Sequence, residues 1–134
     1  MSENLLSSLN KSQKTAAQHI DGPMLILAGA GSGKTKTITT RLAYLISIGI
    51  DPRSILTLTF TNKAASQMRE RAFSMLDSSM INTPPLLCTF HKFGLLFLKF
   101  HMSELNRKNN FIIIDTDDKK RIIKSIDKEI TTSL

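Results

Sequence analysis

The chain has 134 residues, of which 41% are hydrophobic, and a formal net charge of +7 at pH 7. This length allows one ordinary domain, and the longest apolar runs are far too short to span a membrane. The single cysteine, Cys88, excludes an internal disulfide and fits a reducing cytoplasm. All of the excess positive charge lies before residue 111, which favours a polyanionic partner, although ordinary solubility charge is the alternative.

The first predicted elements are a helix, a strand and a second helix. The helix spans about 10–20, and the turn-forming residues 21–23 end it. The apolar run MLILA at 24–28 has no alternation, which is typical of a strand buried on both faces. The second helix spans about 33–48, with Gly49 in the position of a C-terminal cap.

Strands and helices continue to alternate along the rest of the chain. We expect a strand at 55–60, a helix at 62–76, a polar loop ending at Pro85, a strand at 86–89, a helix capped by Thr89, a strand-like stretch at 111–114 and a last helix at 117–130. This alternation predicts an α/β domain with a mostly parallel sheet flanked by helices.

A phosphate-binding loop is predicted between the first strand and the second helix. Its sequence is AGAGSGKT, which comprises Ala28, Gly29, Ala30, Gly31, Ser32, Gly33, Lys34 and Thr35. The glycines let successive N–H groups point inward, and the following helix adds the partial positive charge of its N-terminus. Lys34 can reach outer phosphates, and the Thr35 hydroxyl can hold Mg²⁺. A glycine-rich turn without a ligand is the alternative interpretation.

Two further segments place Thr-Phe at the end of a predicted strand. They are TFTNKAASQMRERA at 59–72 and TFHKFGLLFLK at 89–99. Ligands bind at the carboxyl edge of an open α/β sheet, so Phe60 and Phe90 could stack bases there while polar neighbours hold phosphates. The alternative is that both rings belong to the core and that the polar residues only cap helices.

Together with LNKSQ at 9–13, these segments resemble the superfamily 1 DNA helicases of the UvrD/PcrA/Rep group, in order from about Leu5 to Ile126. The resemblance implies an ATP- and Mg²⁺-dependent motor that moves 3′ to 5′ on single-stranded DNA. It further implies separation of duplex DNA in repair or replication, repair or replication proteins as partners, and a cytoplasmic location. Residues 1–110 would form the first part of a P-loop RecA-like lobe, and residues 111–134 would begin a helical insertion subdomain.

The resemblance also implies roles for single residues. Gln13 would read the adenine edge, and its spacing from Asn10 also fits a capping box. Lys34 and Thr35 would be the catalytic phosphate and magnesium residues of a nucleotide site that comprises residues 28–36. Lys36 stands where the family commonly has an arginine, whose planar group lysine lacks. The DNA contacts would be Phe60, Thr61, Asn62, Thr89, Phe90 and His91, with His91 on the DNA side and not a metal ligand.

The stretch FIIIDTDD at 111–118 leaves three functional classes open. If Asp115 handled the metal, the chain would be a compact kinase or nucleotide switch. If Thr116 instead caps a helix that has Asp117 and Asp118 in its first turn, Asp115 only lies at a helix start. The resemblance favours this second interpretation, because it places the acidic motif beyond residue 134. We therefore expect the isolated chain to bind ATP without significant turnover. A nucleotide-binding module that performs no chemistry, the third class, would behave in the same way.

Overall fold

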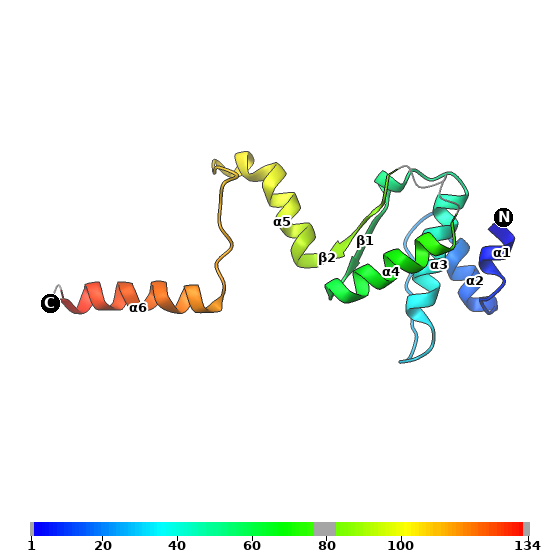
Figure 1. Ribbon diagram of the computed structural model, residues 1–134, viewed down its shortest axis with the longest axis horizontal. Helices are drawn as coiled ribbons and strands as arrows, with labels where there is room; N and C mark the ends of the chain where they lie inside the picture. The colour runs from blue at the N-terminus through cyan, green and yellow to red at the C-terminus, as the bar shows by residue number, and fades with distance from the viewer. Residues whose placement is uncertain (1, 77–82, 133–134) are drawn as a thin grey trace. The chain divides into compact units, whose positions relative to one another are not determined.

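The computed structural model describes residues 2–76 and 83–132, which fall into two compact units, 1–95 and 96–134. The helices are α1 (Ser2–Leu6), α2 (Lys11–Gln18), α3 (Lys34–Ser47), α4 (Asn62–Ser74), α5 (Phe90–His101) and α6 (Thr116–Thr132) (Figure 1). The strands are β1 (Leu56–Thr59) and β2 (Leu86–Thr89), and short 3₁₀ turns are η1 (Pro52–Ser54) and η3 (Met102–Leu105). The predicted α/β class is confirmed, and among the described residues no helix is both long and apolar enough to cross a bilayer.

The two strands pair in parallel, in a register that runs from Leu56 opposite Leu86 to Thr59 opposite Thr89. Helix α4 connects them, as a parallel pair requires. The main core consists of apolar side chains from α3, α4 and β2, namely Leu42, Ile46, Ala65, Met68, Ala72 and Leu87. A second cluster packs Leu6, Leu9 and Ala17 against Tyr44. The N-terminal helices are therefore anchored on α3, which directly follows the predicted phosphate loop.

The predicted strand at 24–28 is wrong for this structure, because the segment has no regular secondary structure. Leu25 and Leu27 are 82% and 85% exposed, and no described segment pairs with theirs. An apolar run becomes a strand only when a neighbouring strand satisfies its backbone N–H and C=O groups. The strand-like stretch at 111–114 is irregular for the same reason. The polar loop predicted before Pro84 lies mostly outside the described residues.

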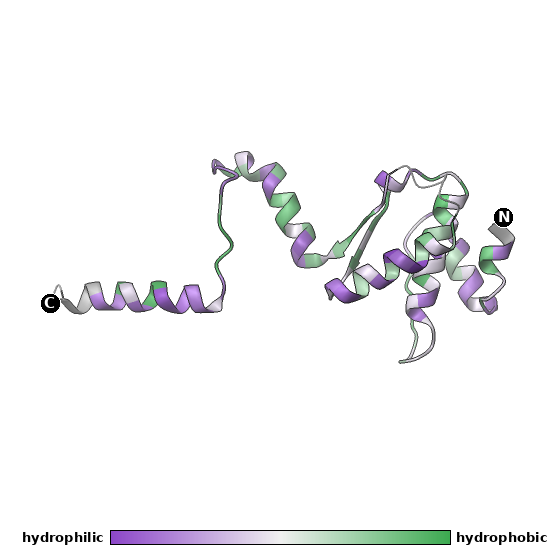
Figure 2. Ribbon diagram, viewed as in Figure 1, coloured by the Kyte–Doolittle hydropathy of each residue, from purple (hydrophilic) through white to green (hydrophobic). Residues whose placement is uncertain are grey.

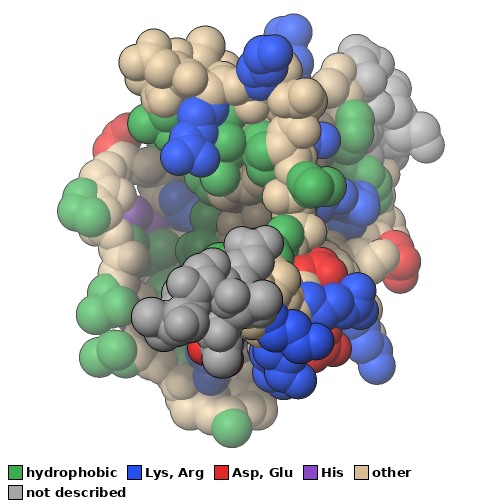
Figure 3. All heavy atoms as spheres, turned by 90° about the vertical axis from the view of Figure 1, so that its left-hand side faces the viewer, with side chains coloured by type: hydrophobic (Ala, Val, Ile, Leu, Met, Phe, Trp, Pro, Cys, Tyr) green, Lys and Arg blue, Asp and Glu red, His purple; other side chains and the backbone are tan. Residues whose placement is uncertain are grey.

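Helix α5 is largely hydrophobic (Figure 2). None of its residues is buried, so its apolar side chains are at least partly exposed. On the face drawn in Figure 3, apolar side chains lie at the surface among Lys and Arg side chains. Exposed apolar patches of this kind mark contact surfaces in soluble proteins. Phe93, Leu96, Phe97 and Phe100 all lie on α5, and none of them is buried among the described residues.

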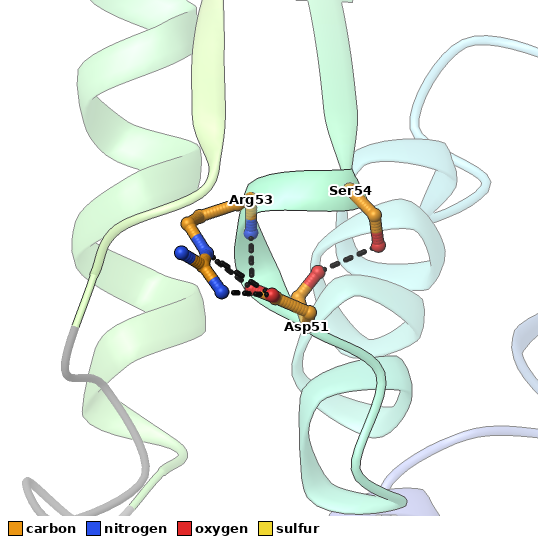
Figure 4. A network of polar contacts seen from close by, with 3 residues as sticks. All are labelled: Asp51, Arg53 and Ser54. Atoms are coloured by element: carbon orange, nitrogen blue, oxygen red, sulfur yellow. Dashed lines mark hydrogen bonds and ion pairs between the residues drawn. The ribbon is translucent and has the colours of Figure 1, made fainter.

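The turn into β1 is held by Asp51 (Figure 4). Its carboxylate accepts hydrogen bonds from the Arg53 backbone at 2.9 Å and from the Arg53 guanidinium at 2.7 Å. The Ser54 hydroxyl donates to the Asp51 carbonyl at 2.7 Å. The hydrogen bonds from Arg53 lower the pKa of Asp51 below its ordinary value. These hydrogen bonds hold the turn that leads into β1.

The end of α3 confirms the predicted glycine cap. Gly49 has a φ of +93°, its N–H donates to Ile46 O at 3.0 Å, and the next N–H, that of Ile50, donates to Leu45 O at 3.1 Å. These two bonds and the left-handed residue are the Schellman motif, which satisfies carbonyls that the helix itself leaves open.

We expect Gly49→Ala to lower the free energy of unfolding by about 1 kcal/mol or more, because an alanine is strained at positive φ. The matched control is Gly94→Ala in α5, where an added Cβ meets nothing within 4 Å. That change should raise stability by about 0.5–1 kcal/mol, since alanine favours a helix interior. Urea or thermal unfolding of both variants measures this, and an unchanged Gly49→Ala protein would contradict the cap.

Candidate functional site

The loop before α3 has the backbone of an anion cradle. Gly31 and Gly33 have φ values of +73° and +85°, which only glycine adopts readily. Ala28 needs no glycine, because its φ is not positive. Gly33 is the N-cap of α3 and offers no side-chain cap, and the first helical bond runs from Thr37 N to Gly33 O at 2.9 Å. The N–H groups of the first turn therefore lack a side-chain acceptor and can bind an anion.

Lys34 is folded back over this loop. Its Nζ donates to Ala28 O and to Gly29 O, both at 2.7 Å. The two carbonyls orient the ammonium group on the loop, where Lys34 and the exposed Thr35 occupy the first two positions of α3. The predicted phosphate lysine and magnesium threonine are thus presented together at one helix start.

Gln13 connects α2 to the loop. Asn10 Oδ1 accepts from Gln13 N at 2.9 Å, and Gln13 Oε1 accepts from Asn10 N at 3.0 Å, so the predicted capping box is confirmed. Gln13 Nε2 also donates to Ser32 O at 3.1 Å. The contact is close, since a Cβ at Gly33 would lie 2.8 Å from Gln13 Nε2. An amide has two hydrogens and two acceptor lone pairs, so each end keeps capacity for a further partner.

Two more side chains of α3 bind the N-terminal helices. Lys36 Nζ donates to Ser8 O at 2.6 Å. Arg41 donates from one guanidinium nitrogen to Ala16 O at 3.1 Å and to His19 O, where it caps the C-terminus of α2. Arg41 has no local sequence pattern that would indicate this role, because its contacts reach residues more than 20 positions away.

The two predicted DNA-side phenylalanines lie next to each other. Because Thr59 is opposite Thr89 in the parallel register, the residues that follow, Phe60 and Phe90, leave the same edge of the sheet. Their ring centroids are 5.5 Å apart at an interplanar angle of 38°. Phe60 is 88% exposed and Phe90 is 50% exposed, so the alternative that Phe60 belongs to the core is wrong.

The threonines beside these rings act as helix caps, as the structural alternative predicted. Thr61 Oγ1 accepts from Ala64 N at 3.1 Å, and Thr89 Oγ1 accepts from Lys92 N at 3.2 Å. Neither α4 nor α5 has an acidic residue in its first turn, and Asn62 and His91 are exposed there. Two helix N-termini without local negative charge therefore flank the aromatic pair, which favours binding of an anion at this edge.

Asp115 caps α6. Its Oδ1 accepts from Asp117 N and from Asp118 N, both at 2.8 Å, and Asp118 Oδ2 accepts from Asp115 N at 3.3 Å. The predicted helix start is confirmed, but Thr116 is the first helical residue and not the cap. Among the described residues, no group of three or more His, Cys, Asp or Glu side chains could hold a metal ion. Asp115 therefore lies at a helix start, and the expectation that it is not a metal carboxylate stays a prediction.

Comparison with known proteins gives a family match over most of the chain. Residues 9–134 match the UvrD/REP helicase N-terminal domain. A probable DNA helicase II homolog of Mycoplasma capricolum is 47% identical over 98% of this chain and 18% of its own length. For the ATP-dependent DNA helicase PcrA of Bacillus subtilis the identity is 42%, over 96% of this chain and 17% of the relative. For the ATP-dependent DNA helicase Rep of Buchnera aphidicola the identity is 44%, over 87% of this chain and 18% of the relative.

The bond between Gln13 and Ser32 can be tested apart from the capping box. Gln13→Ala removes the bond to Ser32 O and the side-chain half of the capping box, in which Gln13 Oε1 accepts from Asn10 N, and should lower the free energy of unfolding by about 0.5–1.5 kcal/mol. Gln13→Glu keeps an oxygen for Asn10 N but loses the donor to Ser32 O, so it should retain most of the stability. Both variants should speed hydrogen exchange of the loop amides, measured by mass spectrometry. If the loop amides of Gln13→Glu exchange at the same rate as those of the unchanged protein, the loop does not depend on the bond from Gln13 to Ser32 O.

Proposed function

The chain belongs to the UvrD/REP helicase N-terminal domain family, and on this basis we propose that it forms the nucleotide-binding part of an ATP-dependent DNA helicase. We propose 3′ to 5′ movement on single-stranded DNA and duplex separation in repair or replication, by a RecA-like lobe. The chain spans less than a fifth of the length of the relatives compared here, 17% to 18%, so the complete motor is part of the proposal. The buried thiol of Cys88, which is free, supports a reducing, cytoplasmic location.

The observation that carries the proposal is the pairing of the two motifs in one folded unit. The same unit of residues 1–95 holds the loop with Lys34 at a helix start and the exposed pair of Phe60 and Phe90 at a sheet edge. A nucleotide site alone would also suit small-molecule kinases and switches. The exposed aromatic pair between helix N-termini is the feature that suits a nucleic-acid strand.

The loop fits Mg-ATP through the groups of its own chain. The N–H groups at the start of α3 would hold phosphate oxygens, the Thr35 hydroxyl would hold Mg²⁺, and Lys34 Nζ would exchange its two carbonyls for phosphate oxygens. Gln13, with one hydrogen and one lone pair still available, would read the adenine edge. Mg-ATP, when bound, supplies the free energy of hydrolysis that drives movement.

The aromatic edge would hold the DNA strand. Phe60 and Phe90 each present a ring face on which a base can stack, and stacking tolerates any base sequence. The N-termini of α4 and α5 would hold flanking phosphates, while Asn62 and His91 would add hydrogen bonds. A motor that must pass along every sequence needs contacts of this kind.

We expect residues 1–134 alone to bind Mg-ATP but to hydrolyse it negligibly, because a single missing charge-stabilising donor typically reduces the rate by about 10²–10³-fold. The full-length protein should hydrolyse ATP and lose this activity in Lys34→Ala. Phosphate release and nucleotide binding measure the two properties. Robust hydrolysis by residues 1–134 that disappears in Lys34→Ala would instead favour a compact enzyme that uses Asp115.

Phe60→Ala in the full-length protein should weaken binding of single-stranded DNA by about 1–3 kcal/mol, the usual contribution of one stacked base. Phe60→Tyr should retain most of the affinity, because it keeps the ring face. Leu56→Ala, at the other end of β1, is the matched control for loss of an exposed apolar side chain. Fluorescence anisotropy with an oligothymidylate measures the affinity of the unchanged protein and of the three variants. Equal affinities would show that the aromatic edge does not bind the strand.

A further inference from the structure

The second unit contains a basic hollow that none of the roles above uses. Its volume is about 330 Å³, and it is lined by Lys99 and Phe100 from α5 and by Arg107, Lys108, Asn109 and Asn110 from the segment that follows. We refer to it as the basic pocket. We propose that the basic pocket binds one nucleotide unit of a single DNA strand, with its phosphates on the cations and its base on Phe100. This inference rests on the proposed function and adds a second strand-binding site to it.

The chain is turned back to build this pocket. After α5, the η3 turn ends at Asn106, which has a φ of +53° and is the single non-glycine residue at positive φ among the described ranges. Asn106 N donates to Ser103 O at 3.0 Å, and Arg107 N donates to Met102 O at 3.1 Å. The reversal brings the segment from Arg107 to Asn110 against the end of α5. The cations thus come from two segments held together by backbone hydrogen bonds.

The cations of the basic pocket have no partners within the described parts of the chain. Lys99, Arg107 and Lys108 form no ion pair or side-chain hydrogen bond there, and the pocket lining contains no acidic side chain. The neighbouring acid, Glu104, bonds instead to His101 Nδ1 at 2.8 Å. Unpaired cations gathered around one hollow repel one another, and an anion relieves this repulsion.

A second basic hollow, in the unit of residues 1–95, shows the contrast. It is lined in part by Arg53, Arg69 and Lys92. Arg53 is already paired with Asp51 at 2.7 Å, and Arg69 donates to Leu87 O at 2.8 Å. Both guanidinium groups there have partners in the structure, whereas the side-chain cations of the basic pocket have none within the described residues and can contact a ligand.

Phe100 indicates that the ligand has a flat face as well as phosphate. Its side chain is 81% exposed beside Lys99, whereas Phe97 on the same helix stacks on His101 with ring centroids 4.4 Å apart. An exposed ring among cations is the arrangement by which proteins bind single strands, because the ring stacks a base and the cations contact the backbone. The amides of Asn109 and Asn110 can donate to phosphate or base oxygens. The volume is large enough for one nucleotide unit.

The test compares the full-length protein with Arg107→Ala/Lys108→Ala and with the control Lys119→Ala/Lys124→Ala, which removes the same charge from α6. Binding of a short oligothymidylate is measured by anisotropy over a range of salt concentrations. Loss of two phosphate contacts should reduce the slope of log K against log salt by about 1.4, since each single-strand contact contributes about 0.7. The control should leave that slope unchanged, and equal slopes in the two double variants would overturn the proposal.

The ring is tested separately. Phe100→Ala should weaken binding of the oligothymidylate by about five- to a hundredfold, and Phe100→Tyr should restore it. Because the side chain is exposed, neither variant should alter the folded structure, which circular dichroism checks. If Phe100→Ala binds like the unchanged protein, no base stacks there and the proposal is wrong.

The remaining outcomes separate this proposal from the proposed function. If Phe60→Ala weakens binding while the pocket variants match their control, only the basic pocket is refuted. If the unchanged protein does not bind the oligothymidylate, both proposals are refuted. Thymidine monophosphate could bind the unchanged protein as tightly as the oligothymidylate does. If Arg107→Ala/Lys108→Ala then loses binding of the monophosphate but keeps binding of the oligothymidylate, the pocket holds a free nucleotide and the strand proposal is refuted.

Discussion

The hydrogen bond from Gln13 to Ser32 O is the contact on which the proposed nucleotide site depends, because it joins α2 to the loop before α3. None of the side chains of the loop before α3 is buried, so its shape depends on hydrogen bonds. Ser32 and Lys34 supply such bonds from within the loop and from the start of α3, and Gln13 supplies one from α2. Helix α2 is held in turn by the Arg41 guanidinium at its C-terminus. A single amide thus completes the cap of one helix and fixes the loop that begins the next. The base-reading role proposed for Gln13 and its structural role are compatible for this reason.

The proposed nucleic-acid edge depends on a different constraint, the register of two short strands. Parallel pairing with Thr59 opposite Thr89 leaves the next residue of each strand at the same edge. The hydroxyls of Thr61 and Thr89, which border this edge, each accept a helix-capping hydrogen bond, and Phe60 is the more exposed of the two rings there. A shift of one residue would send one of the two rings to the opposite face of the sheet.

The sequence predicted those features that are determined locally. The spacing of Asn10 and Gln13 fixed one helix start, and Gly49 fixed the end of α3, because caps involve residues a few positions apart. The strand predicted at 24–28 is absent, because an apolar segment forms a strand only when a second strand pairs with it, and the segment's own residues do not show whether one does. The cap of α6 was misplaced by one residue, since Asp115 and Thr116 both have side chains that can cap. The contacts of Arg41 and the exposure of Phe60 could not be predicted from local sequence patterns, because both depend on segments distant in the chain.

The position of Lys34 has a consequence for how tightly the loop can hold any anion. Its ammonium already has two good acceptors, the carbonyls of Ala28 and Gly29. In the proposed nucleotide site, phosphate oxygens would have to replace these two carbonyls, so that only the difference between the two interactions would contribute to affinity. Such a site would release a departing anion more readily than one in which the lysine had no acceptors, because the carbonyls of the loop would take the place of the anion at once. In the proposed ATP-driven motor, this would favour repeated turnover over tight retention of the anion.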